Sequence, residues 1–548
     1  MLKRILILLP LISMVVSANA QTGKLPAVKT TAFRKDSFNI RSFGAVNDGI
    51  TLNTKIINDA IIACNKKGGG VVVVPKGIWL TGPIVLLSNV NLHLDKNALL
   101  QFTDDLSQFH LIATNWEGQA SFRNEAPVSA TNASNIAITG QGIIDGNGDA
   151  WRAVKKDKLT ETQWKNLQAR GGLLSEDKKT WYPTASSMKG FQTEKAGVIG
   201  SSGKTAADFA EIKDFLRPNL VVFTKCDRIL LEGVTFQNSP AWNLHPLMCT
   251  NLIVRNVYAK NPWYAQNGDG IDVESCKDVL IENSSFDVGD DGLCIKSGRD
   301  EEGRKRNMPT ENVLIRNCTV YHAHGGFVIG SEMSGGAKNI YVYDCTFDGT
   351  DIGLRFKTTR GRGGVVENIF VDGIVMKNIQ GEAILFDMYY MAKDPIVLAG
   401  EKREAPVVEM KPVNATTPQF KNFQIKNIVC NGAAKAIFIR GLPEMNIHDI
   451  SMENMTLSAK KGIEISEAQH ISLKNVAVHS TDKNSAIGIL NSGHIIFSNT
   501  VHVSPAEKVL QIGGERTTDI QWKNSSPAKI KEQTIFEFGA TETSLIIN

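Results

Sequence analysis

Three aspartates in the middle of the chain have the residue type and spacing for acid and base chemistry. Asp269 follows Asn267 and a glycine, and the pair Asp290 and Asp291 follows another glycine. Neighbouring carboxylates repel each other and raise each other's pKa, so collecting them on one surface indicates a task such as sharing a proton. One protonated acid that donates to a leaving oxygen, beside ionised acids that activate water, is the machinery of glycoside hydrolysis.

Basic residues further along the chain indicate an anionic ligand. His324 is followed by a segment, residues 351–364, in which the single acid Asp351 is outnumbered by Arg355, Lys357, Arg360 and Arg362. Such a local excess of positive charge suits an anionic ligand. Lys296 could line the same site or lie at a solvated edge.

One histidine and a pair of tyrosines could contact a sugar. His245 follows Trp242 and could bind one, although a lone histidine between strands is more often packed in the core. Tyr389 and Tyr390 could offer hydrogen bonds or a stacking face. We interpret Asp272 as a turn-forming or water-binding residue, because aspartate often bonds to nearby backbone amides.

The segments that carry these residues form a repeat. Short alternating apolar strands recur at 251–256, 278–283, 312–317, 339–344 and 368–373, and their starts are separated by 27, 34, 27 and 29 positions. Each is followed by a turn residue and a second short strand. The pattern predicts an all-β fold, a single parallel β-helix whose coils stack about 4.8 Å apart, with asparagines at matching turns forming hydrogen-bonded ladders. Stacking would place the chemical residues on one side of the molecule.

The repeat predicts one elongated body over residues 37–548, preceded by an N-terminal extension over 21–36. We expect Thr54 to cap a helix that covers the N-terminal end of the β-helix. Two long loop insertions interrupt the repeat, at about 149–217 and about 389–419.

The first insertion contains a predicted helix of its own. Thr160 and Gln163 have the spacing of a capping box at its start, and Gly171 and Gly172 are expected to end it.

The first twenty residues predict export. Lys3 and Arg4 precede an apolar run over 5–16 and a small-residue cleavage site at 18–20, the pattern of a secretory signal peptide. Removal of these two cations lowers the formal net charge from +4 to +2. No later stretch reaches the roughly 20 apolar residues of a membrane span. We therefore expect a periplasmic or extracellular protein with no membrane span and no nucleic-acid partner.

The eight cysteines are expected to be buried thiols. They lack the compact spacing of a disulfide scaffold, and Cys318 and Cys345 occupy equivalent positions of the repeat. No Cys-x-x-Cys pair occurs, so we expect no metal and no cofactor.

Over roughly residues 43–499 the chain resembles the polygalacturonases of glycoside hydrolase family 28. The motifs that carry the resemblance stand in the family's order: Asn267-Gly268-Asp269, Gly289-Asp290-Asp291, Ala323-His324-Gly325 and Arg355-Phe356-Lys357. The resemblance implies a right-handed, pectin-lyase-like β-helix and inverting hydrolysis of α-1,4-galacturonosyl linkages. The expected partner is an anionic polysaccharide or oligogalacturonide.

The resemblance also implies catalytic roles. Asp290 would be the general acid, and Asp269 and Asp291 would hold and deprotonate the attacking water. Inversion needs acid and base about 6.5–9.5 Å apart to leave room for that water. His324 would tune the acid through a hydrogen bond.

The substrate contacts follow in the same way. Arg355 and Lys357 would hold the uronate carboxylate, since a guanidinium fork matches a carboxylate. The further candidates for substrate binding are Asn267, Lys296, His245 and Tyr389. Ala323 departs from the glycine usual in the family motif, but the retained His324 favours galacturonide bonds over those cleaved by rhamnogalacturonan-specific relatives.

Two other interpretations stay open. A pectate lyase shares the fold and substrate but cleaves by β-elimination, typically with Ca²⁺, for which carboxylates are suitable ligands. A non-catalytic glycan-binding β-helix would need only stacked polar residues. If both insertions rise on the cleft side, they would close one end of the cleft and favour exo-type cleavage.

Overall fold

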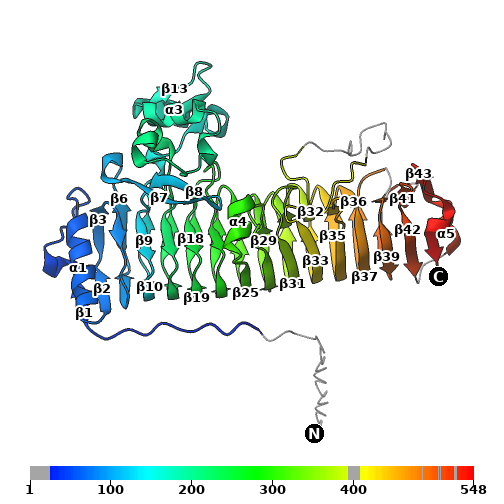
Figure 1. Cartoon of the computed structure of the whole chain (residues 1–548), viewed down its shortest axis with the longest axis horizontal. Helices are drawn as coiled ribbons and strands as arrows, with labels where there is room; N and C mark the ends of the chain where they lie inside the picture. The colour runs from blue at the N-terminus through cyan, green and yellow to red at the C-terminus, as the bar shows by residue number, and fades with distance from the viewer. Residues whose placement is uncertain (1–24, 393–407, 484–485, 504, 507, 524–526) are drawn as a thin grey trace, which may run out of the picture.

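The chain folds into an elongated stack of parallel β-strands (Figure 1). The computed structural model describes residues 25–392, 408–483, 486–503, 505–506, 508–523 and 527–548. Within these residues, a 25-stranded sheet and a 14-stranded sheet run along the body, and neighbouring strands in both are parallel. The predicted right-handed parallel β-helix is confirmed.

Each coil contributes strands to both sheets in turn. In one coil, β24 (Asp291–Lys296) belongs to the 14-stranded sheet and β25 (Thr310–Arg316) to the 25-stranded sheet, before β27 (Gly325–Ile329) returns to the first. Leu293 of β24 pairs in register with Phe327 of β27, and both are fully buried. Because strand side chains alternate, every second residue enters this core, where each large apolar side chain contributes about 1.5–3 kcal/mol.

The residues between these core positions project outward from the 14-stranded sheet and form rows across the coils. The strands concerned are β18 (Leu244–Leu247), β21 (Ile271–Glu274), β24, β27, β30 (Ile352–Lys357) and β32 (Glu382–Asp387). Strand register defines one row as His245, Asp272, Cys294, Val328 and Arg355. Two positions along the same strands, a second row includes Glu274, Lys296, Lys357 and Asp387. Charged residues distant in sequence thereby become neighbours on one face, since adjacent strands lie about 4.8 Å apart.

The predicted asparagine ladders are present. Asn312, Asn339 and Asn368 each begin a repeat with φ between 56° and 59°, the left-handed region that asparagine tolerates. The amide of Asn339 donates to Asn312 at 3.2 Å, and that of Asn368 donates to Asn339 at 3.1 Å. The repeated asparagines are therefore structural.

Helix α1 (Thr54–Lys66) covers the N-terminal end of the β-helix and buries Ile57, Ala60, Ile61 and Cys64. The predicted cap is wrong by one residue. Asn53 is the cap position, and Thr54 lies inside the helix, where its hydroxyl accepts a hydrogen bond from the Gly82 amide at 2.6 Å. The threonine thus ties the helix to the first coils.

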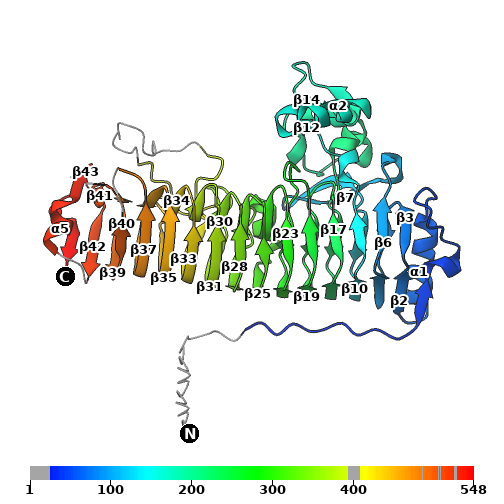
Figure 2. The ribbon, with the colours of Figure 1, turned by 180° about the vertical axis from the view of Figure 1, so that it is seen from behind.

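The first insertion forms a module that rises from one side of the body (Figures 1 and 2). Its helices are α2 (Glu161–Ala169) and α3 (Ala185–Gln192), together with the 3₁₀ segment η6 (Ala206–Phe215). The predicted capping box of Thr160 and Gln163 is present at α2. The second insertion is described in part, because residues 393–407 of the predicted 389–419 lie outside the described residues.

An antiparallel hairpin of β7 (Leu111–Trp116) and β8 (Gln119–Asn124) was not predicted. It lies at the base of the module (Figure 2). Its tip docks on the segment after β24, where Glu117 pairs with Arg299 at 2.9 Å. A side chain at Gly118 would lie 2.4 Å from the Arg299 backbone nitrogen, so the tip requires glycine.

The N-terminal residues 25–36 run along the opposite side of the body from the module (Figure 1). The Lys29 amide donates to Asn251 at 3.0 Å and the Ala32 amide to Asn135 at 2.9 Å. The predicted signal peptide lies outside the described residues. Among those described, no helix combines the length and apolar character needed to cross a membrane.

All eight cysteines are buried and free, as predicted. They stack between coils, as where the Cys249 amide donates to the sulfur of Cys276 at 3.3 Å. They contribute to packing of the core.

Candidate active site

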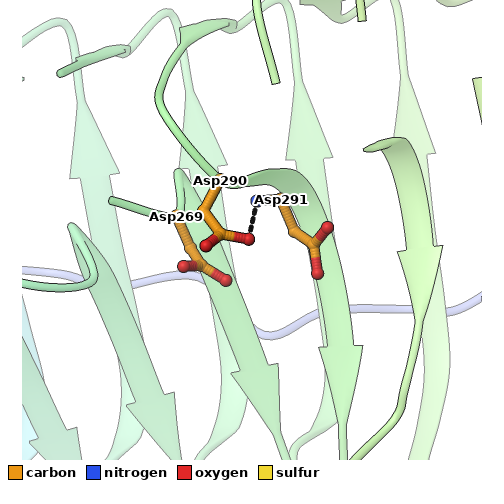
Figure 3. A group of neighbouring side chains, drawn as sticks. All are labelled: Asp269, Asp290 and Asp291. Atoms are coloured by element: carbon orange, nitrogen blue, oxygen red, sulfur yellow. Dashed lines mark hydrogen bonds between the residues drawn. The ribbon is translucent and has the colours of Figure 1, made fainter. Parts of the chain in front are cut away.

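The three predicted aspartates meet at one edge of the 14-stranded sheet (Figure 3). Asp269 precedes β21, Asp290 lies in the turn before β24, and Asp291 is the first residue of β24. One carboxylate oxygen of each lies within 4.8 Å of the others. The close approach of the two coils depends on Gly270, at which a side chain would lie 2.5 Å from the carbonyl oxygen of Gly292.

Asp291 is fixed as a buried carboxylate. Its side chain is 2% exposed, with Oδ2 at 2.8 Å from Lys357 Nζ and Oδ1 at 3.1 Å from an Arg355 guanidinium nitrogen. Burial alone would raise the pKa of Asp291, but Lys357 and Arg355, with a smaller effect of Lys296, hold it well below its usual range. Asp291 is therefore ionised at any ordinary pH.

Asp269 has the opposite electrostatic environment. It is 2% exposed, and its Oδ1 has no hydrogen-bond partner within the described residues. Burial, followed by the charges of Asp272 and Asp290, raises the pKa of Asp269 well above its usual range, although Lys296 opposes this at 3.8 Å. Asp269 therefore binds a proton more tightly than an ordinary aspartate does.

Asp290 is the accessible member of the group, with 23% of its side chain exposed. Its Oδ1 accepts a hydrogen bond from the Asp291 amide at 3.0 Å and lies 3.1 Å from His324 Nδ1. The hydrogen bond to Asp290 raises the pKa of His324 above 6.5, although partial burial opposes this. The more distant Nε2 of His324 is 3.8 Å from Asp351.

Lys296 lies beneath the aspartates and is almost fully buried. Its Nζ is 3.2 Å from Asp272, 3.4 Å from Glu332 and 4.2 Å from the ring centre of Trp242. Burial favours a neutral lysine, but the surrounding acids, Asp272 foremost, hold the pKa of Lys296 well above its usual range. Asp272 is thus part of this buried charge cluster and not merely a turn residue.

Two tyrosines that were predicted together point to different neighbours. Tyr390 lies over the basic pair, with its ring centre 4.9 Å from Lys357 Nζ and 5.8 Å from the Arg355 guanidinium. Tyr389 is buried and contacts Arg360 and Arg440 instead. Of the two, Tyr390 is adjacent to the site.

The remaining candidates, Asn267 and His245, lie on the N-terminal side of the active site. Asn267 accepts a hydrogen bond from Arg217 at 3.0 Å. His245 is buried, with one ring nitrogen 2.9 Å from Glu274 and the other 3.1 Å from the Asn219 amide. Both nitrogens of His245 thus have partners within the protein, and its substrate contact stays a prediction.

Arg217, Glu332 and the hairpin residues Trp116 and Arg123 were not singled out from the sequence. Glu332 accepts from Lys296, and the charges of Lys296 and Arg362 overcome its burial to lower its pKa to about 2. A weak signal was available for Arg217, a cation at the predicted end of the first insertion. Nothing in the local sequence indicated the hairpin contacts.

Three carboxylates in one place are also ligands that Ca²⁺ could take. Both oxygens of Asp291, however, are already occupied by Lys357 and Arg355, and Asp269 favours a proton. The arrangement suits proton transfer and water activation better than chelation of a cation.

Two family models match this chain. The model of glycosyl hydrolases family 28 matches residues 175–419, and a model described as rhamnogalacturonase A/epimerase, pectate lyase-like, matches residues 37–209. Together the two matches span residues 37–419, which include both insertions.

Three relatives illustrate the similarity. A probable polygalacturonase of Vitis vinifera is 28% identical over 434 residues, 77% of this chain and 74% of its own. An exo-poly-alpha-D-galacturonosidase of Dickeya chrysanthemi is 27% identical over 463 residues, 82% and 71% of the two chains. The crystal structure of an exopolygalacturonase from Thermotoga maritima superposes with a TM-score of 0.64 at 29% identity, covering 87% of this chain and 94% of that one.

Proposed function

We propose that this chain is a glycoside hydrolase of family 28, whose model matches residues 175–419, and that it hydrolyses α-1,4-galacturonosyl linkages of polygalacturonate or pectin fragments with inversion. The observation that carries the proposal is the contrast between Asp291, whose pKa Lys357 and Arg355 hold well below its usual range, and Asp269, whose pKa is raised by burial and by the neighbouring acids. Acids with opposite protonation in one site can serve as proton donor and base.

Asp290 donates the proton. It is the most exposed of the three carboxyl groups, and it lies beside Asp269 in the crowded group of acids. Two adjacent carboxyl groups retain one proton between them because both cannot ionise at once. Protonated His324 hydrogen-bonds to Asp290 and balances the charge that forms there when the proton leaves.

Asp291 activates the water molecule. The nearest oxygens of the three acids lie within 4.8 Å, which is closer than the expected separation of about 6.5–9.5 Å and nearer to the spacing of retaining enzymes. Inversion is nonetheless supported, because both oxygens of Asp291 are held by cations and its side chain is 2% exposed. Such a carboxylate is poorly placed to attack a sugar carbon, but it can accept a proton from water.

Arg355 and Lys357 face the substrate side of Asp291 and attract the uronate carboxylate. Tyr390 lies over both cations and adds a stacking face for a sugar ring. The retained His324 supports galacturonide linkages as the substrate. We include Asn267 and Lys296 as residues that position the acids.

The proposal extends to exo-type cleavage. The hairpin β7–β8 and the module of the first insertion rise on the N-terminal side of the acids (Figure 1), and we expect them to close that end of the substrate site. The relatives in Dickeya chrysanthemi and Thermotoga maritima are named as exo-acting enzymes, which supports the same conclusion. The signal peptide predicted for residues 1–20 supports a location in the periplasm or outside the cell.

The test is release of reducing sugar from polygalacturonate by the wild type and by Asp290→Asn, with Asp287→Asn as the matched control. Asp287 lies in the same coil and pairs with His322 at 3.1 Å, away from the other acids. Loss of the proton donor is expected to lower kcat about 10²–10⁴-fold, whereas the control keeps its activity. Full activity of Asp290→Asn would reject the assignment.

Two measurements on the same digest separate the alternatives. Proton NMR of fresh product is expected to show the β-anomer first, and initial α-anomer would overturn inversion. Ultraviolet absorbance is expected to stay flat, because hydrolysis creates no double bond. A rise in absorbance would indicate a lyase, and binding without turnover would indicate a glycan-binding protein.

A further inference from the structure

A second site lies next to the acids, beneath the hairpin β7–β8. A cavity of about 370 Å³ separates the hairpin from the outer face of the 14-stranded sheet, which is within the size range of ligand pockets. His245 lines it on the sheet side, and Trp116 and Arg123 line it on the hairpin side. His245 is one strand away from Asp272, so the cavity ends beside the catalytic group.

Arg123 is a buried cation with no acidic group of the described residues at ion-pair distance, and the acid that acts on it from further away, Glu117, is itself paired with Arg299. Its side chain is 4% exposed, and it forms no ion pair with any described residue. One guanidinium nitrogen donates to the Gly197 carbonyl oxygen at 3.2 Å, and Nε has no partner. The guanidinium lies 3.7 Å above the Trp116 ring, which fixes its plane. Burying a guanidinium charge that forms no ion pair reduces the stability of the fold unless an anion binds to it.

The cavity wall also contains unsatisfied acceptors. Asn115 Oδ1 and Asn124 Oδ1 are buried without a hydrogen-bond partner, and both residues line the cavity. Native proteins satisfy the great majority of such atoms, so each requires an explanation. Because adjacent side chains of a strand point to opposite faces, these oxygens lie on the other face of the hairpin from Trp116 and Arg123, and the guanidinium is the group that the cavity offers to the carboxylate of a uronic acid.

Arg217 connects the cavity to the acids. It lines the cavity, donates to the Gln266 carbonyl oxygen at 2.9 Å and donates to Asn267 at 3.0 Å. Like Arg123, it has no ion pair with a described residue. Burial, reinforced by Arg152, lowers the pKa of Arg217 to about 10 despite the opposing charge of Asp290. The cavity is thus positive where it meets the catalytic group.

We propose that this cavity, the Arg123 pocket, receives the terminal uronic acid residue of the substrate and that Arg123 binds the carboxylate of that residue. The inference rests on the proposed function and deepens it. Arg355 and Lys357 attract a carboxylate beside the acids, whereas Arg123 binds the carboxylate of the terminal residue in the neighbouring cavity. The enzyme then recognises a uronic acid terminus and rejects a neutral sugar in the same position.

The test uses three trigalacturonates: one unmodified, one whose non-reducing terminal carboxyl group is reduced to the alcohol, and one reduced at the other end. The wild type is expected to lose about 10- to 100-fold in kcat/KM on one of the reduced trimers, as for loss of a hydrogen bond to a charged group. Arg123→Gln is expected to lose a similar factor on the unmodified trimer and to stop discriminating.

Arg228→Gln is the matched control, because Arg228 lies on the other sheet and pairs with Asp227 at 3.0 Å. Arg123→Lys, which keeps the charge but not the fork, is expected to retain part of the discrimination. Discrimination as strong in Arg123→Gln as in the wild type, or none in the wild type, would overturn the proposal. If no trimer is hydrolysed, the proposed function fails. Binding of the same trimers, measured by calorimetry, then tests the Arg123 pocket separately: the wild type should bind one reduced trimer more weakly than the unmodified one, and Arg123→Gln should not.

Discussion

Lys357 Nζ lies 2.8 Å from Asp291 Oδ2, and both side chains are almost completely buried. The two residues are 66 positions apart in the sequence and occupy strands separated by one coil. The ion pair therefore exists only because the β-helix stacks its coils in register. It also sets the protonation of the proposed base, which makes it the first target for mutation.

Lys357→Met is expected to lower kcat/KM about 10²–10³-fold, as for removal of a preorganised charge from an active site. Without Lys357 the burial of Asp291 is less compensated, so its pKa rises, and on the acidic side the variant should lose activity at a higher pH than the wild type, in which Asp291 stays ionised. Steady-state kinetics over the acidic range measure both effects. Lys377→Met, at an exposed position of β31 (Val365–Lys377), is the control. An unchanged acidic limb in Lys357→Met would show that Asp291 is not the titrating base.

His324 and His322 form a natural matched pair, because each places Nδ1 at 3.1 Å from an aspartate. Asp290 raises the pKa of His324 above 6.5, so its imidazolium persists to higher pH than that of an ordinary histidine and is lost as the pH rises through the raised value. We expect wild-type kcat/KM to fall on that alkaline side. His324→Asn is expected to be less active at pH 6 and to lack this limb, whereas His322→Asn should behave as the wild type. An alkaline limb that survives in His324→Asn would assign it to another group.

The sequence predicted the acids and the basic pair because they lie in short motifs at strand ends, where the repeat fixes their side of the molecule. It did not predict the partners of Lys296, since Glu332 is brought near by strand register and by the path of the turn after β27. Tyr389 and Tyr390 could not be distinguished, because adjacent residues in a turn face different neighbours. The hairpin was missed because its tip is held by Arg299 and Glu302, about 180 residues away in the sequence.

The hairpin tip offers a test of exo-type cleavage. Gly118→Ala would place a methyl group 2.4 Å from the Arg299 nitrogen at a φ of +79°, so the tip should detach from its docking segment. Gly171→Ala is the matched control, with a φ of +90° and no atom within 4 Å of the added carbon. We expect the first variant to release intermediate oligomers early in digestion of polygalacturonate and the second to give the wild-type products. Chromatography of timed samples measures this. Monomer as the sole early product of Gly118→Ala, with a demonstrably displaced tip, would remove the hairpin as the cause of exo action.

The buried charge cluster predicts an unusual pH dependence of stability. Burial raises the pKa of Asp272 in the folded protein to about 6 from an ordinary 3.8, so the folded state binds more protons than the unfolded state between these values. Stability should therefore fall as the pH rises from about 4 to about 6.5, by an amount on the order of 3 kcal/mol for this group. Asp272→Asn carries no charge to bury, so its free energy of unfolding should decline less over this range. Asp269, whose pKa is also raised, should still give the Asp272→Asn variant part of this pH dependence.

Chemical denaturation at pH 4.5 and pH 8 measures the free energy of unfolding of both proteins, with Asp344→Asn at an exposed left-handed position as the control. An identical decline in Asp272→Asn and the wild type would mean that Asp272 is ionised throughout and that Lys296 compensates its burial completely.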